Sequence, residues 1–341
     1  MLPAGSILQQ NLTRPTFSRR GVVLAVAGIV VSAIAVGLVV RGIDLTSTAS
    51  ALGSADPGWV GVAVALVVVQ VCIRAARWRE LLPRVHTSAP PIIRVVPVTF
   101  VGYLANTILP ARAGEAVRAV LIARRERLPA PETIGSVISE RLVDTLILGV
   151  IGAVAALVLG APEWVVRTGL IAVALAVVAS LVATMVGRMG DRHWHSRLPL
   201  PILRLLEVGL RVARGSGAAR SRRTMVVVVG LSVVSWGLDG AVYWSVARAV
   251  GLEIAPVGAL IVSAVVALST AIPSAPGYIG TFELAAVAAL GVLGVAAAPA
   301  LAVALLSHVA AIVPIAAGGI VSFWWLRGTS AVDRGESLAG A

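Results

Sequence analysis

Long runs of hydrophobic residues alternate with short arginine-rich segments along most of the chain. A membrane-spanning helix needs about 20 consecutive apolar residues, because it must cross the hydrocarbon core of the bilayer. Runs that are long enough, or nearly so, predict six transmembrane helices at residues 21–40, 58–73, 133–160, 164–187, 224–250 and 299–326. The pattern therefore predicts an all-α integral membrane protein.

Two further apolar regions, residues 92–128 and 256–295, are interrupted by proline and glycine. The first region contains LPARAGE and the second contains PSAPG. Irregular backbone survives at membrane depth only where it is buried in protein or lines a wet cavity. Each region therefore predicts a re-entrant helical hairpin, which brings the hydrophobic segments to eight.

The distribution of arginine predicts the topology, because cytoplasmic loops are enriched in basic residues. Most of the arginines, 22 of 28, fall in the segments 1–20, 74–94, 119–132, 188–223 and 327–341. Both termini are then cytoplasmic, and the two hairpins open to opposite faces of the cytoplasmic membrane. The order span–hairpin–span occurs twice, at 58–160 and 224–326, as in the inverted repeats of secondary transporters. We expect one membrane domain, 21–326, with cytoplasmic tails at 1–20 and 327–341.

The segment 188–223, which joins the two halves, admits two interpretations. Its polar residues Arg204, Glu207, Arg211 and Arg214 recur every three or four positions and share one helix face. An arginine-rich amphipathic helix lies in the membrane interface and favours anionic lipid. The alternative is an ordinary cytoplasmic loop that obeys the charge rule.

Composition supports the membrane assignment and narrows the functional classes. Only 13% of residues are charged against 58% hydrophobic, and soluble domains carry about 25% charged residues. The net charge of +12 comes from arginine alone and is confined mostly to loops, so nucleic-acid binding is not expected. The single Cys72 excludes an internal disulfide. No HExxH, GxSxG, Walker or CxxC motif is present, so we expect neither an enzyme nor a bound metal or cofactor.

Five carboxylates lie within the predicted membrane segments: Glu115, Glu140, Asp144, Asp239 and Glu283. A charge in hydrocarbon costs about 3 kcal/mol even on the lenient scales, so these groups should face protein or water. Glu140 and Asp144 are four residues apart and share a helix face, and Arg141 is close enough to pair with Asp144. Such charges either bind a substrate or only fix the packing of broken helices. His308 likewise is either a proton carrier or a hydrogen-bonded core histidine.

The elbows of the two hairpins are marked by residues that end one half-helix and permit a tight turn into the next: Pro110, Gly114, Pro273, Pro276, Gly277 and Gly280. The free N–H groups at the start of a returning half-helix form a natural anion site. Arg112 and Arg118 flank the first such site. A phosphate group is therefore a candidate ligand there.

Four segments occur in an order and spacing typical of one known family: RAARWRELLP (74–83), GYLANTILPARAGEAVR (102–118), SVISERLVD (136–144) and IPSAPGYIGTFE (272–283). With these segments the chain resembles the lysylphosphatidylglycerol synthase transmembrane-region family, also called the flippase-like domain family. The resemblance covers about residues 20 to 326. It implies a polytopic membrane domain that moves lipid between leaflets, as in the multiple peptide resistance factors. Related domains occur alone or joined to glycosyltransferases.

The resemblance implies a lipid translocase with a substrate site at eight residues: Asn106, Arg112, Glu115, Arg118, Glu140, Arg141, Asp144 and Glu283. The expected partners are membrane lipids, namely an anionic or aminoacylated phospholipid or a polyprenyl-phosphate-linked lipid. No aminoacyl-transferase domain follows the last predicted span, so synthesis of the lysyl lipid is not expected. Two alternatives stay open. One is an ion-coupled transporter of a small solute, and the other is a membrane subunit that scaffolds a lipid- or glycan-synthesis enzyme.

Overall fold

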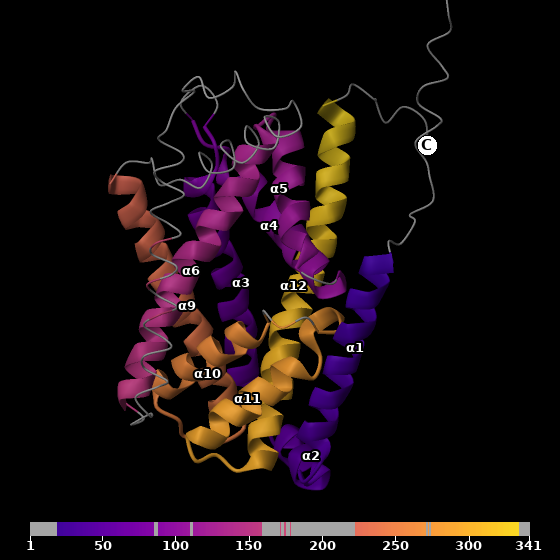
Figure 1. Cartoon of the computed structure of the whole chain (residues 1–341), viewed down its shortest axis with the longest axis vertical. Coiled ribbons are helices and arrows are strands. Elements are labelled where there is room, and N and C mark those ends of the chain that lie inside the picture. Colours follow the sequence, from indigo (N-terminus) through magenta and orange to yellow (C-terminus); the bar gives the residue numbers. More distant parts are fainter. Residues whose placement is uncertain are drawn as a thin grey trace, which may run out of the picture.

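The computed structural model describes residues 19–84, 88–109, 112–158, 222–270, 272 and 274–333, with three isolated helical positions at 171, 174 and 178. Across these residues the chain is helical and contains no β-strand, which confirms the predicted all-α class (Figure 1). The elements are α1 (Arg19–Val40), α2 (Leu45–Gly53), α3 (Pro57–Leu81), α4 (Ile92–Ile108), α5 (Ala113–Arg125), α6 (Ala130–Val158), α9 (Arg222–Ala249), α10 (Pro256–Ser269), the 3-10 turn η2 (Pro276–Tyr278), α11 (Thr281–Val292) and α12 (Ala297–Asp333). The predicted span 164–187 and nearly all of segment 188–223 lie outside the described residues.

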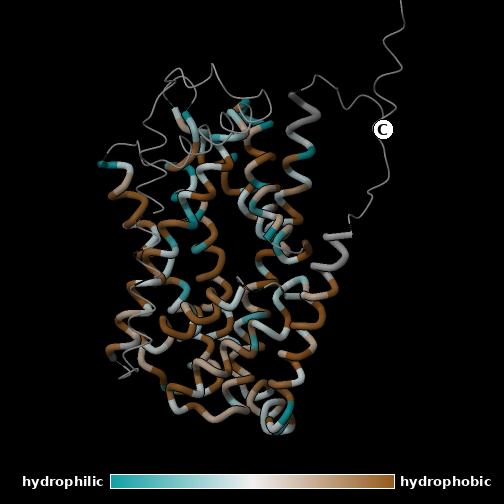
Figure 2. Tube along the Cα trace, in the orientation of Figure 1, coloured by the Kyte–Doolittle hydropathy of each residue, from teal (hydrophilic) through white to brown (hydrophobic). Residues whose placement is uncertain are grey.

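Several helices have the length and composition of membrane spans. In the described part of the chain these are α3, α9 and α12, and the bent pair α1–α2 counts as a fourth if it is one broken span. These helices are hydrophobic along most of their length (Figure 2), and large apolar residues such as Val69, Val226 and Val321 are exposed. A lipid environment explains this exposure, because a water-soluble protein rarely leaves large apolar patches uncovered. The membrane class is thus confirmed, while the total of six spans stays a prediction.

The two interrupted regions form helical hairpins. Helix α4 packs against α5, and α10 packs against α11, with a non-helical elbow between the members of each pair. Figure 1 places α4 and α5 in one half of the molecule and α10 and α11 in the other, with the elbows facing each other at mid-height. The contact is direct, because Nε of Arg112 in the first elbow donates to the carbonyl of Thr270 in the second, at 3.3 Å.

The packing partners of the first hairpin are matched by those of the second. Helix α4 packs on α3, α5 on α6 and α4 on α12, while α10 packs on α9, α11 on α12 and α10 on α6. The long contact between α3 and α9 joins the two sets. Each hairpin has its own hydrophobic core, one around Trp78, Val98 and Ile122 and the other around Val262 and Leu290. The predicted bounds of the repeat halves, 58–160 and 224–326, stay predictions.

Glycine allows the first hairpin to close tightly. A Cβ atom added to Gly114 would lie 2.0 Å from the carbonyl oxygen of Gly102, which is far inside van der Waals contact. Helices α4 and α5 therefore touch backbone to backbone at this point. Helix α12 also approaches α4 closely, with the backbone of Gly318 against the ring of Phe100, because a Cβ on Gly318 would lie 2.6 Å from that ring.

Helix α3 is longer than the hydrophobic pattern predicts. The pattern ends the span at residue 73 and assigns residues 74–94 to a cytoplasmic segment, whereas α3 continues to Leu81. Arg77 and Trp78, which follow the apolar run, are almost completely buried. The helix continues past the apolar run because the fold supplies the arginines that follow it with carboxylate partners.

We call the end of the molecule where α3, α5 and α12 finish and α4 and α9 begin the arginine end. Arginines lie there at Arg84, Arg94, Arg124, Arg223 and Arg327. The positive-inside rule predicts that this end faces the cytoplasm.

Candidate functional site

A cavity of about 230 Å³ lies between the tips of the two hairpins. Its walls come from α3, α4, α5, α6, α11 and α12 and from both elbows. One part of the wall is polar and charged, while Val71, Phe282, Ile312 and Ile315 supply an apolar part. The polar lining consists of Gln70, Arg74, Tyr103, Asn106, Thr107, Arg112, Glu115, Arg141, Thr270, Tyr278 and His308. A site of this kind suits a ligand that is itself partly polar and partly apolar.

Arg112 links the two elbows and faces the cavity. It precedes α5 with a left-handed backbone conformation (φ 54°), which turns its side chain toward the second hairpin. Its guanidinium donates to the carbonyl and the hydroxyl of Thr270. Its nearest carboxylate, Glu115, lies 4.0 Å away, and 29% of the side chain is exposed. Arg112 is therefore fixed in position while part of its charge is free to meet a ligand.

Two further arginines line the cavity with carboxylate partners. Arg141 on α6 contacts Glu115 on α5 at 2.9 Å and Asp144 on its own helix at 3.7 Å. Arg74 on α3 contacts Asp239 on α9 at 2.5 Å. These pairs join α5 to α6 and α3 to α9 beside the cavity.

A second group of charges lies behind the cavity and is almost completely buried. Arg77 donates from Nη2 to Glu140 at 2.6 Å and from Nη1 to Asp144 at 2.5 Å. Arg118 donates to the other oxygen of Glu140, and its guanidinium lies 4.5 Å from the centre of the Trp78 ring. We call Arg77, Arg118, Glu140 and Asp144 the buried charge cluster. A carboxylate held by two arginines is a stable arrangement only when every partner is present.

The arginines and carboxylates that pair with one another around the cavity are unequal in number. Five arginines (Arg74, Arg77, Arg112, Arg118 and Arg141) meet four carboxylates (Glu115, Glu140, Asp144 and Asp239), while the fifth carboxylate, Glu283, pairs with His308. Since an unpaired charge is expensive in this environment, the surplus of one positive charge favours an anionic ligand.

The second elbow is held by a separate hydrogen-bonded set. One carboxylate oxygen of Glu283 accepts the backbone N–H of Gly280 at 2.6 Å and caps α11. The other oxygen pairs with Nδ1 of His308, whose Nε2 lies 2.8 Å from the carbonyl oxygen of Gly277. A carbonyl only accepts, so Nε2 carries a hydrogen. The contact between Nδ1 and Glu283 then shares a single proton, and the imidazole ring stacks on Phe282 at 4.1 Å.

The eight predicted site residues fall into two groups. Asn106, Arg112, Glu115 and Arg141 line the cavity, and Arg118, Glu140, Asp144 and Glu283 lie behind its wall. Among the elbow residues, Gly277 lines the cavity, Gly114 packs α5 on α4, Pro276 begins η2 and Gly280 precedes α11. Pro110 and Pro273 lie outside the described residues. The binding roles of all eight stay predictions.

Two arginines of the site, Arg74 and Arg77, were missed because the sequence assigned them to a cytoplasmic segment. The sequence did contain a signal for them, namely the imbalance of charge in the predicted membrane segments. These segments hold five carboxylates but only three arginines, Arg112, Arg118 and Arg141. Additional buried cations were therefore needed, and RAAR at the end of the preceding apolar run was the nearest source.

Comparisons with known proteins agree with this fold. The family described as "Lysylphosphatidylglycerol synthase TM region" matches residues 25–319. The chain is also similar to "Glycosyltransferase AglD" of Haloferax volcanii, with 29% identity over 375 aligned positions. That alignment covers 96% of this chain and 58% of the relative.

Proposed function

The chain belongs to the lysylphosphatidylglycerol synthase transmembrane-region family, and on this premise we propose that it is a lipid translocase and not an enzyme. It would move a lipid with a phosphate-bearing headgroup across the membrane through the central cavity. The acyl or polyprenyl chains would stay in the bilayer while the headgroup passes between the two elbows.

The observation that carries this proposal is the cavity between the hairpin tips, with its surplus positive charge and its mixed lining. Two opposed hairpins with a ligand site where their tips meet resemble the architecture of secondary transporters that work by alternating access. The ligand chemistry follows from the charge, because an arginine fork pairs with phosphate through two parallel hydrogen bonds.

The lining residues suggest how a headgroup would be held. Arg112 is the strongest candidate for the phosphate contact, since its guanidinium is positioned by Thr270 and its nearest carboxylate is 4.0 Å away. The side-chain oxygen of Asn106 is buried with no hydrogen-bond partner in the described structure, so it is available to a headgroup hydroxyl or ammonium. Glu115 and Arg141, which form an ion pair with each other, complete the polar part of the wall.

Two lipid classes meet these requirements, namely an anionic or aminoacylated phospholipid and a polyprenyl-phosphate-linked lipid. The relative named as a glycosyltransferase is a reason to include the second class in the tests. Both classes would present a phosphate group to Arg112. One transport assay can test both, and the labelled lipid that moves tells the two classes apart.

The test is lipid movement in vesicles that contain the purified protein and a headgroup-labelled lipid. Dithionite does not cross the membrane, so label on the inner leaflet is quenched only if the protein carries the lipid outward. We expect wild-type protein to expose the inner label of at least one phosphate-bearing lipid. The Arg112→Gln and Asn106→Ala variants should slow this movement strongly.

Arg248→Gln is the matched control for charge removal, because Arg248 lies outside the cavity and pairs with the exposed Glu253. It should transport like wild type. If the Arg112→Gln variant moves lipid at the wild-type rate, the cavity is not part of the transport pathway. If wild-type protein moves no lipid of either class, the translocase proposal is wrong.

A second candidate function is a membrane subunit that scaffolds a lipid- or glycan-synthesis enzyme. The supporting observation is that this chain aligns with only part of a relative named as a glycosyltransferase. This candidate predicts no lipid movement by the purified protein and a stoichiometric complex with such an enzyme, isolated from native membranes. Lipid movement without any partner would contradict it.

A further inference from the structure

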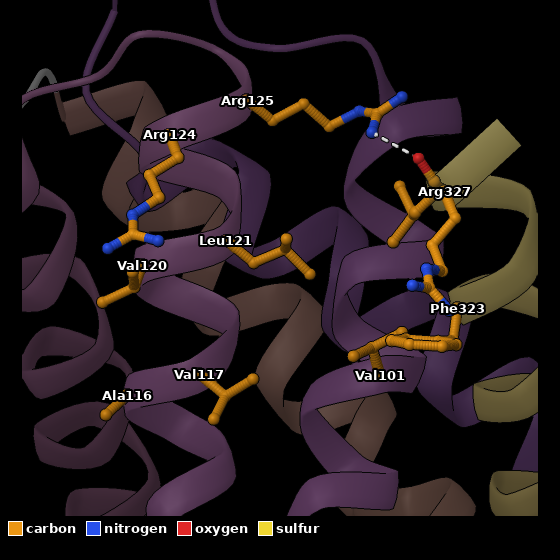
Figure 3. Close-up of a pocket in the computed structure, with 10 residues that line it drawn as sticks. Val101, Ala116, Val117, Val120, Leu121, Arg124, Arg125, Phe323 and Arg327 are labelled. Carbon is orange, nitrogen blue, oxygen red and sulfur yellow. Dashed lines mark hydrogen bonds between the residues drawn. The ribbon is translucent and has the colours of Figure 1, made fainter. Parts of the chain in front are cut away.

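A groove of about 700 Å³ runs along the outside of the protein between α5 and α12, away from the central cavity. Its inner part is apolar, with Val117, Val120 and Leu121 on α5 and Phe323 on α12 (Figure 3). No residue that lines this groove lines the central cavity. The groove is therefore a separate feature of the membrane-facing surface.

The arginines that line the groove all lie at one end of it. Arg124 follows the apolar residues of α5 on one wall, and Arg327 follows Phe323 on the other (Figure 3). Arg125 reaches across from α5 to the carbonyl of Leu326 on α12, at 3.0 Å, and closes the groove above them. The groove thus has one charged end and one apolar end, like a phospholipid.

The depth of the charged end is indicated by aromatic residues. Trp324 and Trp325 are exposed beside Phe323, and aromatic side chains of this kind concentrate at the membrane–water interface. This places Arg327 at the level of the lipid headgroups. Along α5, Ala116 lies eight positions before Arg124, which carries the groove about 12 Å deeper, into the hydrocarbon.

Two of the three arginines at this end have no carboxylate partner in the described part of the protein. Arg124 and Arg327 are both exposed, and neither has a carboxylate partner among the described residues. The Arg327 guanidinium lies over the rings of Phe323 and Trp324, at 5.3 and 5.6 Å from their centres. Stacking holds the flat face of the guanidinium and leaves its N–H edge for an anion.

We propose that this groove binds one anionic phospholipid of the arginine-end leaflet. One acyl chain lies against Val117, Val120 and Leu121, and the phosphate contacts Arg327 and Arg124. The charge pattern points to this occupant, because an anionic phospholipid carries a phosphate at one end and an apolar chain at the other, as the groove requires, whereas a zwitterionic lipid would leave the charge of the two arginines uncompensated. Cytoplasmic leaflets are rich in anionic lipid, which matches the predicted orientation of this end. The binding does not depend on lipid translocation.

The test is native mass spectrometry of the protein released from nanodiscs of equal phosphatidylglycerol and phosphatidylcholine. Wild-type protein should retain phosphatidylglycerol in preference to phosphatidylcholine. The Arg124→Gln/Arg327→Gln variant should lower the retained phosphatidylglycerol by about tenfold, since both arginines face the phosphate. The groove-filling variant Val117→Trp, with Val120→Phe as a milder form, should lower it without any change of charge.

Arg222→Gln/Arg223→Gln is the matched control. It removes two exposed arginines from the same end of the molecule, but on α9 and outside the groove. This control should retain phosphatidylglycerol like wild type. The proposal is overturned if wild type retains the two lipids equally, or if the control loses as much phosphatidylglycerol as the Arg124→Gln/Arg327→Gln variant. It is also overturned if that variant or Val117→Trp retains phosphatidylglycerol like wild type. Retention of a protein in place of lipid would also overturn it.

Discussion

The guanidinium of Arg77 lies 2.6 Å from the carboxylate of Glu140, and both side chains are almost completely removed from the surface. The two residues come from α3 and α6, 63 positions apart. Glu140 also holds Arg118 from α5, so one carboxylate joins three helices around the first hairpin. Trp78, which donates from Nε1 to Ser136 on α6 at 3.0 Å, packs beside the same cluster. The buried charge cluster is thus the clamp that keeps the first hairpin against its neighbours.

Removal of the Glu140 charge should therefore destabilise the protein strongly. Glu140→Gln leaves Arg77 and Arg118 buried with one carboxylate fewer, and the loss of one partner of a buried pair costs about 3–5 kcal/mol. Thermal unfolding of the protein in detergent measures the effect. The control is Glu253→Gln, which breaks an exposed pair with Arg248 and should change stability by less than about 1 kcal/mol. Equal unfolding temperatures for the two variants would contradict the clamp.

The close approach of α4 and α5 makes a second prediction. Gly114→Ala introduces a methyl group 2.0 Å from the backbone oxygen of Gly102, so the two helices must separate. We expect a loss of about 1–3 kcal/mol, typical of overpacking in a tight core. The matched control is Gly230→Ala on α9, where nothing lies within 4 Å of the added atom. That change should be neutral or stabilise by about 0.5–1 kcal/mol, because alanine favours a helix. A Gly114→Ala variant as stable as wild type would show that the hairpin is looser than described.

A third prediction concerns the second elbow. His308→Leu removes the hydrogen bonds to Glu283 and to the Gly277 carbonyl, and it leaves buried acceptors unpaired. The expected loss is about 1–3 kcal/mol per orphaned group. The neighbouring Ser307→Ala is a close control, since the Ser307 hydroxyl is buried without a partner in the described structure. Ser307→Ala should lower the free energy of unfolding much less than His308→Leu does.

Hydrogen–deuterium exchange of the protein in detergent can locate the effect of His308→Leu. If the histidine holds the second elbow, backbone amides near residues 274–280 should exchange faster before the rest of the molecule unfolds. A uniform change along the chain would instead indicate that His308 acts only as a core residue.

The sequence alone determined the properties that depend on local chemistry. Hydropathy predicted the all-α membrane class, since a run of apolar residues carries its own preference for the bilayer wherever the other runs lie. Proline and glycine predicted the interruptions of α4–α5 and α10–α11, because they act on the backbone at their own positions. The carboxylates at Glu115 and Glu140 were recognised for the same reason, since charge in an apolar run is visible without any knowledge of the neighbours.

Tertiary structure decided which of these charges meet and which face a cavity. Glu140 and Asp144 lie on one face of one helix, but only the packing of α3 against α6 brings Arg77 to both of them. The groove beside Arg125 is likewise made by a contact between α5 and α12 across 201 positions of the chain. Such contacts depend on helix crossing and close backbone approach, as at Gly102 and Gly114. No periodicity within a single segment encodes them, because a helix presents the same face to whichever partner the fold supplies.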